Sequence, residues 1–229
     1  MPPQVLRGPD FWERYVVFID CKQFKIFLSD FMKLFSKAVK CQYVIRSRKE
    51  GKKEECTAPK ISQRVGRSGI ANIFAAVFRG QIVVWQEYTV WNGATHKRML
   101  RILSDRLVAL FGPLILSDGP NGKHLVCHDN DRVFNAAECQ ARLRHYGMDP
   151  MPLPVRSPWL MPLDYSIWVQ ILKKMEADTP NAKEKVPQYK ERLEHTANHL
   201  PDLTPTLRNM CARVDILCKS HGNPVNALK

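Results

Sequence analysis

The chain has 229 residues, of which 45% are hydrophobic and 25% charged, a composition that indicates a folded core and excludes a disordered tail or a fibrous repeat. Lys and Arg number 35 against 22 Asp and Glu, and the resulting net charge of +13 favours an anionic partner, most often nucleic acid. No apolar run reaches the roughly 18–20 residues of a membrane span, and the first residues contain no apolar signal-peptide core. Because the seven cysteines are odd in number and follow no repeated spacing, we expect reduced thiols in an intracellular protein.

The predicted elements alternate between strands and helices. The β-branched and aromatic residues of 15–27 predict a first strand. Two apolar runs, 70–78 and 81–86, are separated by Arg79-Gly80 and predict a hairpin. Helical spacing and short apolar runs predict the next five elements: helix 96–111, strand 124–129, helix 135–146, strand 148–154 and helix 163–175.

Two polar stretches divide the chain. The first, at about 46–67, holds eight Lys or Arg residues and is predicted to be a long loop or hairpin arm. The second, 178–187, is flanked by proline and predicts a linker to two further helices near 189–200 and 204–218. We therefore expect one α/β domain over residues 1–177, with the basic arm inside it, and a linker with C-terminal helices over 178–229.

Three aspartates have unusual positions in this pattern. Asp20 lies inside the first strand, where a carboxylate is costly unless it is paired or binds a metal ion. Asp129 ends a later strand, and Asp164 opens a helix after Ser157-Pro158. A single aspartate at such a place is ordinarily a cap or turn residue, and Asp131 competes with Asp129 for the second position. Taken together, three carboxylates are hard oxygen ligands suited to Mg²⁺ or Mn²⁺.

The sequence around each aspartate resembles one of the three catalytic motifs of mariner-superfamily transposases. The first has apolar or aromatic residues four and seven positions after its aspartate, the second ends in Asp-Asn, and the third combines Ser-Pro, a later Pro, the acid and an aromatic residue. In this chain they read Val17-Phe18-Ile19-Asp20 with Phe24 and Phe27, Leu125-Val-Cys-His-Asp129-Asn130, and Ser157-Pro158 with Pro162-Leu-Asp164-Tyr165 and Trp168. The final acid is an Asp, is separated from Asp129 by 34 residues and is followed by Tyr165, which resembles the mariner branch rather than its relatives with a final Glu. The resemblance covers roughly residues 11–172, and a weaker one extends through Arg213, Cys218 and Gly222.

This resemblance implies a ribonuclease-H-like fold, with a five-stranded mixed sheet flanked by helices. Asp20 would lie on the first strand, Asp129 at the end of the fourth, and Asp164 at the start of the helix after the fifth. It also implies a transposase or endonuclease-type enzyme in which these three residues are catalytic and hold two Mg²⁺ or Mn²⁺ ions. Water would attack first to cut a DNA strand, and the freed 3′-hydroxyl would then attack target DNA. DNA is the expected partner, and the resemblance is compatible with a homodimer. Neither a membrane nor a small-molecule cofactor is expected.

The basic arm has two interpretations. By default it is a solvated loop, but mariner enzymes carry a clamp loop between their first two strands, so the resemblance implies an arm that contacts DNA or a partner. Part of it also resembles a weak nuclear import signal, which favours a nuclear location. The residues expected to contact nucleic acid are Arg46, Arg48, Lys49, Lys52, Lys53 and Asn130.

The chain departs from the family pattern in several places. Cys21 stands where the family often has Glu, Phe134 where it has His, and Trp159 where it commonly has Asp. Only 19 residues precede Asp20, so we expect the family's helix-turn-helix module to be absent. Two alternatives therefore stay open: a catalytically silent, domesticated transposase-derived protein that binds nucleic acid or a protein partner, and another ribonuclease-H-like nuclease or integrase. Trp159 and Trp168 are expected to be packing residues.

Overall fold

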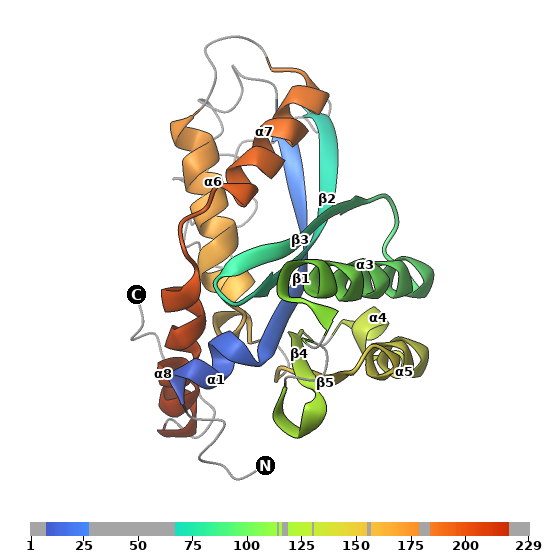
Figure 1. The fold of residues 1–229 in the computed structure, drawn as a ribbon. Helices are drawn as coiled ribbons and strands as arrows, with labels where there is room; N and C mark the ends of the chain where they lie inside the picture. The colour runs from blue at the N-terminus through green and yellow to red at the C-terminus, as the bar shows by residue number, and fades with distance from the viewer. Residues whose placement is uncertain are drawn as a thin grey trace, which may run out of the picture.

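A five-stranded mixed sheet forms the centre of the computed structural model, which describes residues 8–27, 67–113, 115, 119–129, 131–154, 157–178 and 184–219. Its strand order is β3-β2-β1-β4-β5 (Figure 1). The strands are β1 Val16–Phe27, β2 Arg67–Phe78, β3 Gln81–Tyr88, β4 His124–His128 and β5 Met148–Pro152. The predicted number of strands and their mixed character are confirmed.

The pairing of the strands follows from their connections. β1, β2 and β3 are antiparallel, and the β2–β3 turn uses Arg79 and Gly80 with φ angles of 48° and 77°. This left-handed pair is typical of a two-residue hairpin, as predicted. Gly80 is also required by a close approach, because a Cβ atom there would lie 2.3 Å from the Thr204 hydroxyl oxygen. β4 joins β1 in parallel, and β5 joins β4 in parallel.

Helices cover both faces of the sheet (Figure 1). One face is covered by α1 Pro9–Arg14, α6 Trp168–Ala177, α7 Val186–Asn198 and α8 Thr204–Lys219. The opposite face is covered by α3 Gly93–Phe111, α4 Arg132–Asn135 and α5 Ala137–His145. Alternate residues of β1 serve the two cores: Phe18 points to the first and Ile19 to the second. No helix in the described ranges is long and apolar enough to cross a membrane.

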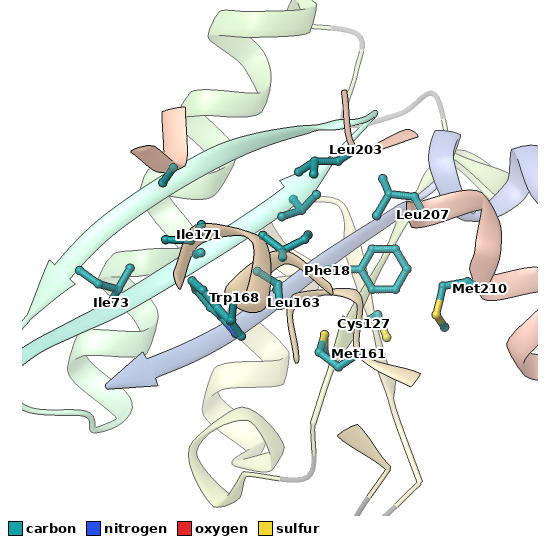
Figure 2. Packing of buried hydrophobic residues seen from close by; sticks show 14 of the residues in the cluster. Phe18, Ile73, Cys127, Met161, Leu163, Trp168, Ile171, Leu203, Leu207 and Met210 are labelled. Atoms are coloured by element: carbon teal, nitrogen blue, oxygen red, sulfur yellow. The ribbon is translucent and has the colours of Figure 1, made fainter. Parts of the chain in front are cut away.

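The first core includes the helices near the end of the chain. Leu207 and Met210 of α8 are buried with Phe18 of β1 and Trp168 of α6 (Figure 2). Leu193 of α7 belongs to the same buried cluster. The C-terminal helical part therefore packs directly on the sheet, and the division of the chain at residue 178 stays a prediction.

Helices α1 and α8 lie against each other although they are far apart in the sequence. Arg208 of α8 forms ion pairs with Glu13 at 2.7 Å and with Asp10 at 3.1 Å. Beneath these ion pairs, Phe11 and Trp12 are buried in the first core. The two helices thus close the same end of the sheet.

Local hydrogen bonds move some helix boundaries from their predicted places. α3 begins at Gly93 rather than 96, because the Asn92 side chain accepts a hydrogen bond from the Thr95 backbone N–H at 2.9 Å and caps the helix. The single helix predicted over 135–146 is two helices, because Ala136 has an extended backbone between α4 and α5.

Candidate active site

The three predicted aspartates lie at the positions in the fold that the sequence indicated. Asp20 lies within β1, Asp129 directly follows β4, and Asp164 lies in the turn that leads into α6. In the parallel pairing of β1 with β4, Phe18 is opposite Cys127. Asp20 and Asp129 each follow that pair by two residues, so they lie at the same level at one end of neighbouring strands.

Asp20 is a buried carboxylate with a hydrogen-bond donor on each oxygen. Only 7% of the residue is exposed. The indole N–H of Trp168 donates to Oδ2 at 2.8 Å, and the backbone N–H of Cys21 donates to Oδ1 at 2.7 Å. Burial, followed by the negative charge of Asp164, raises the pKa of Asp20 to about 7, and Asp129 adds a smaller effect in the same direction. The two hydrogen bonds act in the opposite direction.

Asp164 lies in a single π-helical turn, η6 Leu163–Ile167, which runs straight into α6. Asp164 is half-buried, and the N-cap position of this turn is occupied by Pro162. Burial raises the pKa of Asp164, the charge of Lys22 lowers it, and the charge of Asp129 raises it. Lys22 lies two residues after Asp20, on the same face of β1. π-helical turns inside longer helices occur frequently at functional sites.

Asp129 and its rival Asp131 have different environments. Asp131 is the N-cap of α4, and its Oδ1 accepts a hydrogen bond from the Val133 backbone N–H at 2.6 Å. Asp129 is exposed at the strand end, and its Oδ1 accepts a hydrogen bond from the Asp131 backbone N–H at 3.2 Å. Partial desolvation is the main effect that raises the pKa of Asp129. Asp131 therefore has a structural role that Asp129 lacks.

The donor chemistry of these three residues suits a divalent cation. The charges of Asp164 and Asp129 raise the pKa of Asp20, and the charge of Asp129 raises the pKa of Asp164, so the carboxylates repel until a cation neutralises them. Hard oxygen ligands favour Mg²⁺ or Mn²⁺. Each Asp20 oxygen keeps a lone pair beyond its one hydrogen bond. Within the described part of the chain, no three His, Cys, Asp or Glu side chains are already arranged to hold a metal ion.

The first departure from the family pattern, Cys21, lies on the opposite face of β1 from Asp20. Its thiol is hydrogen-bonded to Tyr88 of β3, and burial raises the pKa of Cys21 well above its ordinary value. A protonated, half-buried thiol is a packing group at neutral pH. Cys21 therefore adds no ligand to the aspartates.

The second departure, Phe134, belongs to a buried aromatic cluster under β4. Its ring centroid lies 5.4 Å from that of Trp91, 5.0 Å from His96 and 5.2 Å from His128. His96 Nδ1 and His128 Nε2 are buried without a hydrogen-bond partner among the residues described. Burial lowers the pKa of His96 to about 4, and that of His128 is lowered for the same reason. This cluster is therefore neutral at physiological pH.

Two features of the third motif escaped the sequence prediction. Trp168 is buried as predicted, but it also donates a hydrogen bond to Asp20. Arg213 of α8 stacks on the Tyr165 ring, 3.6 Å from its centroid, and donates to the Trp159 carbonyl at 2.9 Å. The Tyr165 hydroxyl in turn donates to the Thr206 carbonyl at 2.8 Å. The sequence signal that could have indicated a role for Trp168 at the site was its position, four residues after Asp164.

The predicted contacts to nucleic acid are not part of this geometry. They comprise the basic-arm residues and the residue after Asp129, all of which lie outside the described residues. Their role stays a prediction for Arg46, Arg48, Lys49, Lys52, Lys53 and Asn130.

Solved structures with a similar fold include the catalytic domain of the Mos1 mariner transposase and a Mos1 transpososome. The Mos1 mariner transposase catalytic domain aligns with a TM-score of 0.63 and 13% identity over 95% of this chain and 86% of that chain. The Mos1 catalytic domain with raltegravir and Mn gives a TM-score of 0.65 and 13% identity, over 99% and 98%. A pre-cleavage Mos1 transpososome gives a TM-score of 0.67 and 14% identity, over 94% of this chain and 58% of that chain. At this identity the likeness establishes the fold, and the predicted ribonuclease-H-like fold is confirmed. No protein-family model matches the chain, and no curated protein matches it either.

Proposed function

We propose that this chain is a transposase catalytic domain that cuts and joins DNA strands at a site formed by Asp20, Asp129 and Asp164. The observation that carries the proposal is the buried Asp20 on the central strand, with its pKa raised to about 7 by burial and by the charges of Asp164 and Asp129. Such a carboxylate destabilises the fold unless it binds a cation, and carboxylates with strongly shifted pKa values are concentrated at functional sites. The fold of the Mos1 catalytic domain adds support.

Asp20, Asp129 and Asp164 would together hold Mg²⁺ or Mn²⁺, in two ions if the family pattern applies. When bound, such ions polarise the scissile phosphate and activate the attacking oxygen. The Mos1 catalytic domain has been solved with Mn and with Mg. The chain's own part is to fix Asp20 through its two donors and to supply the positive charge of Lys22 beside Asp164, which reduces the repulsion of DNA phosphate.

The test exploits the contrast between Asp129 and Asp131. We expect the wild type to nick supercoiled plasmid DNA in Mg²⁺ or Mn²⁺, and Asp129→Asn to lower the nicking rate by at least about 100-fold, because a metal ligand is lost. Asp131→Asn is the matched control, since Asn caps a helix about as well as Asp, and it should keep its rate.

The results separate three cases. A wild type that does not nick in either metal ion would contradict the catalytic function and favour the silent, domesticated descendant. Nicking by Asp129→Asn at the wild-type rate would exclude Asp129 from the site. Loss of nicking in both variants would show that the α4 start, rather than a ligand, had been disturbed.

DNA is the proposed partner. The similar structures include a strand transfer complex and paired-end complexes of Mos1, and the net charge of +13 suits a polyanion. Replacing Lys49, Lys52 and Lys53 with Ala should reduce the slope of log affinity against log salt by roughly two to three, provided that all three contact phosphates.

The control for this prediction removes the same charge elsewhere. The control uses three exposed lysines: Lys173 on α6, Lys185 just before α7 and Lys219 at the end of α8. Replacing these three with Ala should leave the slope near the wild-type value. Equal slopes for the wild type and both triple variants would favour the interpretation of the basic arm as a solvated loop that does not contact DNA.

A further inference from the structure

We infer that Trp168 is a positioning residue for the carboxylate site: its indole N–H fixes the orientation of Asp20 and ties the helix that carries Asp164 to the central strand. The inference rests on the proposed function, which it deepens. Trp168 itself contacts neither DNA nor the reacting atoms in this proposal. It acts through Asp20.

The hydrogen bond joins parts of the chain that are 148 residues apart. Trp168 Nε1 lies 2.8 Å from Asp20 Oδ2, within a region where Trp168 is 1% exposed and Asp20 7%. Trp168 is the first residue of α6 and follows Asp164 by four positions, about one helical turn. The bond therefore sets the position of the Asp164 turn relative to β1. Figure 2 shows the Trp168 side chain lying over the sheet beside Leu163.

The indole ring is held so that its N–H has a defined direction. Phe24 of β1 packs edge-on against it, with centroids 5.7 Å apart, and Trp85 of β3 packs at 5.9 Å. Because both neighbours belong to the sheet, the ring is held over the sheet. A donor in a fixed ring is better suited to orienting a carboxylate than a flexible side chain would be.

The two donors on Asp20 leave room for a cation. Oδ1 accepts from the Cys21 N–H and Oδ2 from Trp168, so rotation of the carboxylate is restricted while each oxygen keeps a free lone pair. Loss of the indole N–H would release one oxygen, and the carboxylate would turn toward other geometries. Donors that orient metal ligands typically change metal affinity or activity by about 10–100-fold when they are removed.

Trp12 offers a matched control in the same core. It is 6% exposed and stacks on Phe18 with centroids 6.4 Å apart, but its Nε1 has no hydrogen-bond partner among the described residues. Trp168→Phe and Trp12→Phe each remove an indole from the first core, and only the first removes a donor from Asp20. We expect both variants to lose thermal stability.

The separating measurement is the response to Mg²⁺ and Mn²⁺. We expect Trp168→Phe to need at least about tenfold more metal ion than Trp12→Phe for half-maximal thermal stabilisation, with nicking at saturating DNA reduced about tenfold or more. DNA affinity should be alike in the two variants. An equal metal requirement in the two variants would overturn the inference and leave Trp168 as a packing residue.

A measurement without metal ions tests the hydrogen bond from Trp168 to Asp20 independently of the proposed function. The indole N–H resonance of Trp168, assigned by its loss in Trp168→Phe, should move in the Asp20→Asn variant, whereas that of Trp12 should not. An unmoved Trp168 resonance would refute the tie to Asp20. A wild type that responds to neither metal ion would overturn the proposed function, while a moved resonance would still support the tie.

Discussion

Asp164→Asn is expected to lower Mg²⁺- or Mn²⁺-dependent nicking by several orders of magnitude while the protein stays folded. Asn keeps the size of the side chain but removes an anionic ligand from a site that needs charge to hold a cation. Because Asp164 adds a negative charge beside the buried Asp20, its neutralisation should raise the thermal stability of the metal-free protein slightly. Nicking and thermal stability, each with and without Mg²⁺, measure both effects.

A helix-capping role for Asp164 leads to a different expectation. Asn caps about as well as Asp, so neither activity nor stability would move. The structure already disfavours this role, since the N-cap position of η6 is Pro162 and Asp164 is the second residue of the turn. Asp178→Asn, at the exposed far end of α6, is the matched control. Persistent nicking in Asp164→Asn would end the three-aspartate proposal.

The effect of Asp20→Asn on the stability of the metal-free protein is expected to be more favourable at pH 8 than at pH 4 by about 2–4 kcal/mol. Burial raises the pKa of Asp20 from 3.8 to about 7 in the folded protein, so the folded state holds this proton more tightly than the unfolded chain does. The stability associated with the protonated form is complete below about pH 4 and is lost as the pH rises through 7. Asn is uncharged at every pH, and its Oδ1 can still accept from Trp168. Its Nδ2 cannot accept from the Cys21 N–H, but this loss is the same at every pH and does not affect the pH dependence.

The measurement is the difference in unfolding free energy between wild type and Asp20→Asn, followed from pH 4 to pH 8. The wild-type curve alone is ambiguous, because burial lowers the pKa of His96 to about 4, and its stabilising effect fades as the pH falls through the same range. The exposed Asp105→Asn on α3 is the control and should give no pH-dependent difference. A difference that does not grow between pH 4 and pH 8 would contradict the raised pKa. Adding Mg²⁺ at pH 8 should stabilise the wild type but not Asp20→Asn.

Local sequence signals were sufficient to predict the strands and the positions of the three aspartates in the fold. The dense β-branched and aromatic residues around Asp20 predict β1, and a carboxylate among them is conspicuous because its burial is costly. The Arg79-Gly80 pair predicts the hairpin, because few residues tolerate two successive left-handed positions. These features depend on neighbours in the sequence, so they can be predicted from it.

Features that depend on distant contacts could not be predicted. α1 has six residues, too few to show helical periodicity, and it is stabilised by packing on α8. The break at Ala136 carries no glycine or proline signal. The hydrogen bond from Trp168 to Asp20 spans 148 residues, and an indole that packs looks the same in a sequence whether or not its N–H finds an acceptor.

The closure of one end of the sheet by α1 and α8 has a consequence for the newly made protein. Glu13 and Arg208 are 195 residues apart, so at typical rates of translation α8 follows α1 by roughly 10–40 s. During that interval Phe11 and Trp12 have no α8 to cover them, and the nascent chain exposes an apolar surface of the kind that chaperones bind. Arg213, which stacks on Tyr165 beside Asp164, arrives with the same helix. The carboxylate site is therefore completed only after α8 has been synthesised.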